Sequence, residues 1–111
     1  MQKVSESQFA YRDGLSGVKY MMRGPKIDWG IILMLPGETL SGHYHEQVEE
    51  TFYVAEGAGI FLINGERHTG QPGDALRLEP QDRHEIRNEG AEPLKLIFIK
   101  CPYLPQDRVS L

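Results

Sequence analysis

The sequence predicts an all-β fold, either a sandwich of two sheets or a closed barrel. Short apolar stretches recur at intervals of about 8–12 residues, a spacing typical of small β-proteins. The 12 glycines and 7 prolines lie scattered between these stretches and divide the chain into short elements. No segment shows the apolar period of a helix. At 111 residues the chain is expected to form a single domain, residues 1–111.

The first half of the chain is expected to hold four strands. Residues 1–13 are polar and weakly patterned, which indicates an edge strand or a segment lying over the surface. A strand over 18–22 ends at a Gly-Pro pair, which no regular element continues through. The apolar, β-branched run 29–35 is typical of a strand buried on both faces. The strands over 39–45 and 50–55 follow, separated by a polar turn.

The second half is expected to hold five more strands. Two apolar or alternating runs, 60–63 and 66–69, flank an Asn-Gly pair, which favours a two-residue type I′ hairpin. A Pro-Gly-Asp turn precedes a strand over 75–78, and a further strand covers 84–88. The apolar run 94–100 is the last expected strand, and the proline-containing tail beyond it is expected to lie across the surface or against a second subunit.

Two histidines on the third expected strand suggest a metal site. His43 and His45 are two residues apart, so on a strand they share a face, with Cα atoms roughly 6.5–7 Å apart. Two imidazoles at that spacing can converge on one metal ion, although such a pair alone is more often coincidental. Carboxylates follow at Glu49 and Glu50, and simple alternation favours Glu49, which shares odd numbering with both histidines. Nitrogen and oxygen donors of this kind suit zinc, iron, nickel, copper or manganese.

The same stretch resembles the first motif of the cupin superfamily, whose members fold as small jelly-roll barrels. In that motif a glycine precedes two histidines, a glutamate and a second glycine at set spacings. The pattern falls without a gap on Gly37, His43, His45, Glu50 and Gly57. The resemblance therefore implies that Glu50 is the carboxylate ligand, against the alternation argument.

A second cupin motif follows with two departures. Gly73, His84 and Asn88 stand in register with the motif. Glu79 and Gln81 occupy the places where the motif has proline and glycine, so the charged loop before His84 is atypical. The resemblance spans about half of the chain, and the flanking strands suit the remainder of a jelly-roll barrel.

The resemblance implies a site and a choice of functions. Its metal ligands would be His43, His45, Glu50 and His84, holding one divalent transition ion (Fe, Mn, Ni, Co, Cu or Zn) with two octahedral positions open. Cupins include dioxygenases, isomerases and lyases as well as non-catalytic binding modules, and fold alone does not choose between them. Because this stretch has no helical segment for a helix-turn-helix, a metal-dependent enzyme acting on a small organic molecule is favoured over a regulator.

Bulk properties exclude several function classes. A net charge of −4 gives no electrostatic footprint for nucleic acid. No apolar run approaches the roughly 20 residues of a membrane span, and the N-terminus lacks a signal-peptide core, so a cytoplasmic location is expected. The lone Cys101 fits a reducing compartment and is expected to be a buried, inert thiol.

A homodimer and a few further candidates complete the predictions. The runs 29–35 and 94–99 are apolar on both faces. A second copy of the chain is therefore expected to cover the outer face of these strands, which gives a homodimer. Arg77 could bind a carboxylate in the cavity, although a solvent-facing position is favoured. No general base is evident, and Glu49, Tyr53 and His68 are candidates only by elimination.

Overall fold

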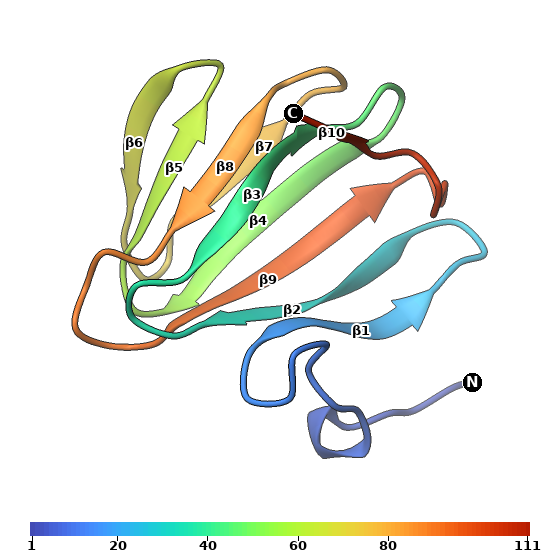
Figure 1. The fold of residues 1–111 in the computed structure, drawn as a ribbon. Helices are drawn as coiled ribbons and strands as arrows, with labels where there is room; N and C mark the ends of the chain where they lie inside the picture. The colour runs from blue at the N-terminus through green and yellow to red at the C-terminus, as the bar shows by residue number, and fades with distance from the viewer.

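The computed structural model describes residues 1–111 as an almost purely β structure (Figure 1). The elements in chain order are η1 (a 3₁₀ turn, Glu6–Gln8), β1 Gly17–Arg23, β2 Asp28–Met34, β3 Thr39–Tyr44, β4 Glu49–Glu56, β5 Gly59–Ile63, β6 Glu66–Gly70, β7 Ala75–Leu78, β8 His84–Arg87, β9 Leu94–Cys101 and β10 Val109–Ser110. The all-β prediction is confirmed, and every expected strand lies within one residue of its predicted limits. No helix in the structure has the length and apolar character that crossing a membrane requires.

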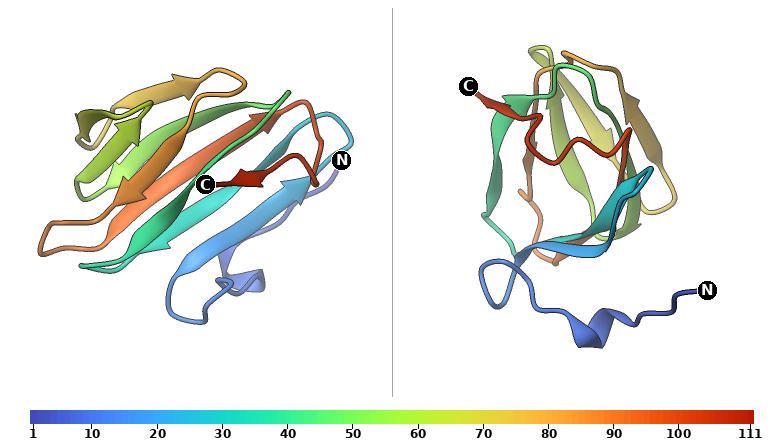
Figure 2. Two further views of the ribbon diagram at one scale, coloured as in Figure 1. Left: turned by 45° about the horizontal axis from the view of Figure 1, so that its top comes forward. Right: turned by 90° about the vertical axis from the view of Figure 1, so that its right-hand side faces the viewer.

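The strands form two five-stranded sheets that face each other and enclose the interior (Figure 2). One sheet has the order β1-β2-β9-β4-β7, and the other has the order β10-β3-β8-β5-β6. All strand pairs are antiparallel. The predicted type I′ hairpin joins β5 to β6, since both of its turn residues, Asn64 and Gly65, have the positive φ values (51° and 83°) that this turn needs. The architecture is the jelly-roll barrel that the cupin resemblance implied.

The interior changes from apolar to polar along the barrel. Its core consists of ten buried side chains: Ile32, Met34, Phe52, Val54, Phe61, Leu78, Ile86, Leu94, Leu96 and Phe98. On the paired strands β4 and β9, the inward-facing partners are Val54 and Leu96, then Phe52 and Phe98, then Glu50 and Lys100. The strand period of two thus carries one row of side chains from the core directly to a charged pair at one end of the barrel.

The C-terminal tail runs back to the second sheet. The tail was expected to lie across the surface or against a second subunit. Residues 102–105 are neither strand nor helix, as expected, whereas the end of the tail pairs with the histidine-bearing strand: Val109 is the partner of Tyr44 and Ser110 is the partner of His43. This two-residue strand, β10, is too short to show a period in the sequence. It places the tail beside the polar end of the barrel (Figure 2).

The outer face of the first sheet is only partly covered. The N-terminal segment lies against β1 and β9, where the Lys19 ammonium donates to the Glu6 carbonyl at 3.1 Å and Lys95 pairs with the Glu6 carboxylate at 3.0 Å. Further along the sheet, Tyr53 and Ile99 remain 44% and 42% exposed. An apolar outer surface therefore remains on β4 and β9.

Candidate metal centre

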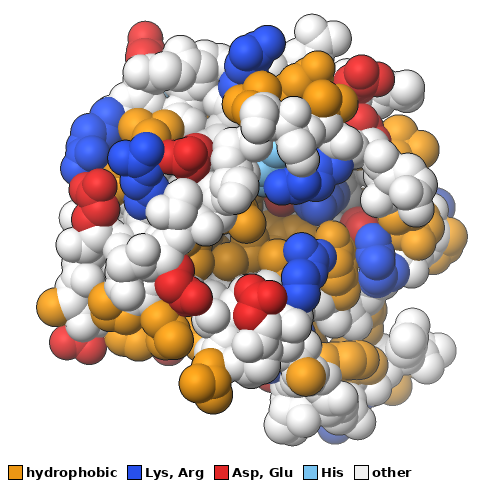
Figure 3. Space-filling model, viewed as in Figure 1, with side chains coloured by type: hydrophobic (Ala, Val, Ile, Leu, Met, Phe, Trp, Pro, Cys, Tyr) orange, Lys and Arg blue, Asp and Glu red, His pale blue; other side chains and the backbone are white.

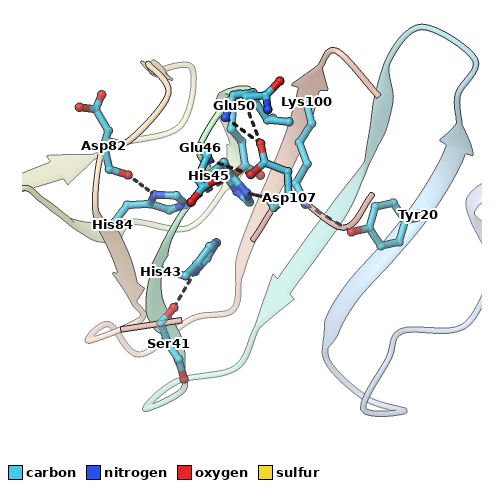
Figure 4. A network of polar contacts seen from close by, with 12 residues as sticks. Tyr20, Ser41, His43, His45, Glu46, Glu50, Asp82, His84, Lys100 and Asp107 are labelled. Carbon is cyan, nitrogen blue, oxygen red and sulfur yellow. Dashed lines mark hydrogen bonds and ion pairs between the residues drawn. The ribbon is translucent and has the colours of Figure 1, made fainter. Parts of the chain in front are cut away.

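Four buried side chains from both sheets meet at the polar end of the barrel (Figure 4). His43 on β3 is the cross-strand partner of His84 on β8, and His45 lies just beyond the end of β3. Glu50 reaches the same point from β4 in the opposite sheet. The pairing register shifts between Leu40 and His43. The shift turns the Leu40 side chain toward the core and the His43 side chain into the cluster. All four residues are at most 5% exposed.

Each histidine is oriented by a backbone carbonyl that contacts its Nδ1. The carbonyl oxygens contacting His43, His45 and His84 belong to Ser41, Asp107 and Asp82, respectively. A carbonyl only accepts hydrogen bonds, so each Nδ1 carries a proton and each Nε2 of a neutral ring presents a lone pair. This second contact is what fixes the tautomer and the ring orientation of metal-ligating histidines in general.

The Nε2 lone pairs converge on the Glu50 carboxylate. His45 Nε2 lies 3.0 Å and His84 Nε2 lies 3.4 Å from the same oxygen, Oε1. His84 Nε2 is buried and has no hydrogen-bond partner. A second proton on one ring could satisfy one of these contacts, but only a cation at the centre would satisfy all the acceptors at once. The ligand atoms of the four residues lie within 4.8 Å of one another, so the donor set fits a single metal ion.

The ionisation states also suit a metal ligand set. Burial raises the pKa of Glu50, but in the metal-free site hydrogen bonds donated by the His45 and His84 imidazoles, together with the Lys100 ammonium, lower it to about 2. Burial lowers the pKa of His43 to about 4, an effect that the Ser41 carbonyl only partly offsets. At neutral pH Glu50 is therefore ionised and His43 is neutral, which are the forms that bind a metal.

Asp107 holds the turn that carries His45. Its carboxylate accepts hydrogen bonds from the backbone N–H groups of Glu46, Gln47 and Val48 at 2.8, 2.8 and 2.9 Å (Figure 4). Burial raises the pKa of Asp107, but these N–H donors outweigh it and the net shift is downward. The backbone carbonyl of Asp107 contacts His45 Nδ1. Asp107 therefore both holds the turn after β3 and orients the His45 imidazole.

The atypical loop before His84 keeps a well-bonded shape. Gln81 adopts a positive φ of 73°, the conformation that favours the glycine found there in the cupin motif. Its N–H donates to the His45 carbonyl at 2.6 Å. The Asp82 carboxylate accepts from the Glu79 N–H and from the Asn64 side chain, at 2.8 and 2.9 Å. The departures from the motif therefore change the residues of the loop without breaking its connection to the cluster.

A cavity of about 70 Å³ adjoins His43 and Glu50. Its floor is apolar and is made by Val18, Ile32, Leu40 and Phe98, and its remaining wall is made by Arg12, Tyr20, Lys100 and Arg108. Figure 3 shows this hollow with hydrophobic side chains at its base, Lys and Arg side chains and an acidic side chain at its rim, and a histidine visible inside. The sequence reasoning missed these wall residues. The even-numbered, inward period of β9 could have found Lys100, but no local pattern marks Arg12 or Arg108.

The other sequence candidates lie away from the cavity. Arg77 faces solvent, with 67% of its side chain exposed, and pairs with Glu79 at 3.4 Å and with Glu49 at 3.9 Å. Tyr53 is on the outer face of β4, and His68 is exposed on β6. The prediction of a buried Cys101 was wrong. This thiol is exposed because Cys101 continues the outward-facing, odd-numbered positions of β9.

Glu49 and Glu50 point to opposite sides of the sheet. Glu50 is 3% exposed and joins the histidines, whereas Glu49 lies by Arg77 outside the barrel. The alternation argument failed because His45 and Glu50 belong to different sheets and a turn between them resets the facing. Asn88, the last residue of the second motif, is buried and donates to the carbonyls of Met34 and Glu92, both at 2.9 Å, which is a structural role.

Comparison with known proteins agrees with this architecture. The family model described as "Cupin domain" matches residues 30–100, which include all four residues of the cluster. A crystal structure of an uncharacterized conserved protein with a double-stranded beta-helix domain, from Klebsiella pneumoniae subsp. pneumoniae, superposes with a TM-score of 0.85. It covers 99% of this chain and 96% of its own at 18% identity, so the likeness concerns the fold.

The curated relatives include proteins with functional names. The tetracenomycin polyketide synthase protein TcmJ of Streptomyces glaucescens is 32% identical over 81 residues, which are 73% of this chain and 54% of that protein. Gentisate 1,2 dioxygenase 1 of Aquipseudomonas alcaligenes is 35% identical over 65 residues, 59% of this chain and 19% of that protein. The chain thus spans about half of the first relative's length and a much smaller part of the second.

Proposed function

This chain belongs to the Cupin domain family, and on that premise we propose that it is a metal-dependent enzyme acting on a small organic molecule. One divalent transition ion is held by His43, His45, Glu50 and His84. Four protein ligands leave two positions of an octahedral ion open, as a substrate requires. When bound, such an ion supplies Lewis-acid chemistry or, if it is iron, chemistry with dioxygen.

The single observation that carries this proposal is the convergence of lone pairs without donors. Three Nδ1 atoms contact carbonyls, so the Nε2 atoms of the neutral rings present lone pairs in a buried space that also holds the Glu50 carboxylate, and His84 Nε2 has no hydrogen-bond partner. Unpaired buried acceptors are costly, by about 1–3 kcal/mol each, unless a cation satisfies them. A closed structural site is disfavoured, because such sites are usually tetrahedral and often use thiolates, whereas Cys101 is exposed on the outer face and is not part of the cluster.

The chain's own residues shape the rest of the site. The apolar floor of the cavity excludes water from one side of the cluster. The Lys100 ammonium donates to the Tyr20 hydroxyl at 3.3 Å, so the phenol oxygen and the ammonium form a polar pair beside Glu50. A proton required at the substrate can be held at the Tyr20 hydroxyl, the one hydroxyl in the cavity wall.

A non-catalytic binding module is the second candidate, and one observation favours it. Apart from the proposed ligands His43 and Glu50, the cavity wall has no carboxylate or imidazole. General-base catalysis most often uses such groups, so the cavity offers few options for proton abstraction. The curated relatives named for enzymes support catalysis, and the sparse acid–base inventory supports binding alone.

Metal analysis and turnover measurements test the proposal together. We expect freshly purified protein to hold one transition ion per chain, and His45→Ala or His84→Ala to weaken metal binding by at least about 10-fold. Water-proton relaxation of the Mn²⁺-loaded protein should reveal exchangeable water in the open positions. Absence of bound metal, with no thermal shift on adding any of the six ions, would refute the metal centre.

Catalysis itself is tested by incubating the loaded and metal-free proteins with a library of small organic acids and phenols, under air and under argon, with NMR detection. Metal-dependent conversion of a compound supports the enzyme. Saturable binding without conversion favours the binding module.

A further inference from the structure

We propose that the cavity beside the metal centre is an anion subsite, and that its ligand is a small molecule with a carboxylate head and an apolar body. The inference rests on the proposed function, since the metal centre would be where this ligand reacts or is held. It adds Lys100, Arg108 and Arg12 as the residues that select a negative charge.

The cavity wall concentrates positive charge that has no acidic partner. Arg12, Lys100 and Arg108 come from three separate segments: the chain before β1, the end of β9 and the tail before β10. None of them has a carboxylate oxygen within 4.0 Å. Of the nine other Lys and Arg residues, five are paired with acids: Arg23 with Asp28, Arg67 with Glu89, Arg77 with Glu79, Arg87 with Glu85 and Lys95 with Glu6. In a chain with a net charge of −4, three cations without an acidic partner therefore line a cavity that reaches the cluster.

Lys100 is the central residue of this group. It lies in register between Glu50 on one neighbouring strand and Asp28 on the other. Both acids are already engaged, Glu50 by the histidines and Asp28 by Arg23 in a two-point contact at 3.1 and 3.2 Å. The half-buried Lys100 ammonium has one hydrogen bond, to the Tyr20 hydroxyl, and an ammonium offers three donors. Two donors remain for an incoming anion.

The two arginines add planar donors on either side. Arg108 donates to the Ser110 hydroxyl at 2.9 Å, and it lines the same cavity as His43. The Arg12 guanidinium has no hydrogen-bond partner within the chain. A guanidinium matches the two oxygens of a carboxylate in a planar, bidentate arrangement. Together with Lys100, these groups offer more donors than a neutral ligand would use.

The shape of the cavity indicates the rest of the ligand. Its floor is formed by Val18, Ile32, Leu40 and Phe98, so the body of the ligand meets hydrocarbon. The space of about 70 Å³ adjoins a second hollow of about 190 Å³ that shares Arg12, Tyr20, Lys100 and Arg108 with it. A compact aliphatic or single-ring body fits this space, with the anionic head between the metal ligands and the cations.

Calorimetric titration with a matched set of probes tests the subsite. Benzoate carries the proposed head and body, benzamide has the same shape without charge, and phenyl phosphate has a different anionic head. We expect the Zn²⁺-loaded protein to bind benzoate at least about 10-fold more tightly than benzamide, since hydrogen bonds to charged groups contribute about 1.5–3 kcal/mol each. Weaker binding of phenyl phosphate than of benzoate supports a carboxylate head, and the reverse order would overturn that choice.

Substitutions locate the effect. Lys100→Met should weaken benzoate binding roughly 10-fold and leave benzamide binding unchanged. Lys26→Met is the matched control, because Lys26 is an exposed lysine in the turn between β1 and β2 and lies away from the cavity. Arg108→Gln gives a second, independent variant if Lys100→Met does not fold.

Equal affinity for benzoate and benzamide, no binding of either at millimolar concentration, or an equal effect of the two lysine substitutions would overturn the subsite. Elemental analysis of the same samples reports separately on the proposed metal centre. If no metal binds, the proposed function fails, and the same titrations on the metal-free protein still decide whether the cavity selects anions.

Discussion

Asp107→Ala should loosen the metal centre from a distance, because Asp107 connects the tail to the turn that carries His45. The substitution removes a carboxylate that accepts three backbone N–H groups, those of Glu46, Gln47 and Val48. Without it, the carbonyl of residue 107 is no longer held against His45 Nδ1. The tail strand β10, which begins two residues later, would also lose its anchor.

The size of the effect follows from the exposure of each bond. The bonds to the Glu46 and Gln47 N–H groups are exposed, so water replaces much of each and about 0.5 kcal/mol is lost per bond. The bond to Val48 is partly buried and ends on a charged acceptor, for which about 1.5 kcal/mol is appropriate. The free energy of unfolding should therefore fall by about 2–3 kcal/mol. Metal affinity should fall by about 10–100-fold, the usual consequence of losing the group that orients a ligating histidine.

Urea unfolding of the metal-free proteins and metal titration of the folded ones measure the two effects. Asp74→Ala is the matched control, because the Asp74 carboxylate accepts a single exposed backbone bond, from Gln71 at 2.8 Å, and lies far along the chain from His45. The control should lose about 0.5 kcal/mol and keep its metal affinity. If Asp107→Ala unfolds no more easily than the control and binds metal as tightly as the unsubstituted protein, the positioning role of the tail is refuted.

Four further outcomes are expected. Glu50→Gln should weaken metal binding by at least about 10-fold and Glu49→Gln should leave it unchanged; the opposite pattern in a metal titration would favour the alternation argument. The pKa of His43 is about 4 in the folded protein against about 6.5 when unfolded, so the unfolded state takes up this proton first on acidification. The metal-free protein should thus lose about 3 kcal/mol of stability between pH 6.5 and 4, and His43→Asn should flatten this slope in pH-dependent denaturation. Gln81→Gly should raise the unfolding free energy by up to about 1 kcal/mol by relieving the positive φ of 73°, and a lower midpoint would contradict that reasoning. We also propose a homodimer through the outer face of β4 and β9, for which light scattering should give about twice the 12.6 kDa chain mass and Ile99→Glu should give a monomer.

Local patterns in the sequence were sufficient for the strands and for part of the site. Alternation and the Gly, Pro and Asn-Gly breaks act over a few residues, so the limits of β1 to β9 could be predicted to within one residue. The spacing of His43 and His45 placed two imidazoles on one face without any tertiary information. Family-specific spacing added Glu50 and His84, which alternation alone would not have chosen.

Tertiary structure decided what depends on pairing between distant segments. The choice between Glu49 and Glu50 follows from the turn after His45, and that turn is held by Asp107, about 60 residues further along the chain. Lys100 and Arg108 meet at one cavity because β9 and the tail belong to opposite sheets that face each other there. The two-residue strand β10 has no period of its own and exists through its partner on β3. Sequence periodicity indicates which face of its own strand a residue occupies. The assembly of a site depends on contacts between residues far apart in the sequence, and a local pattern does not identify those partners.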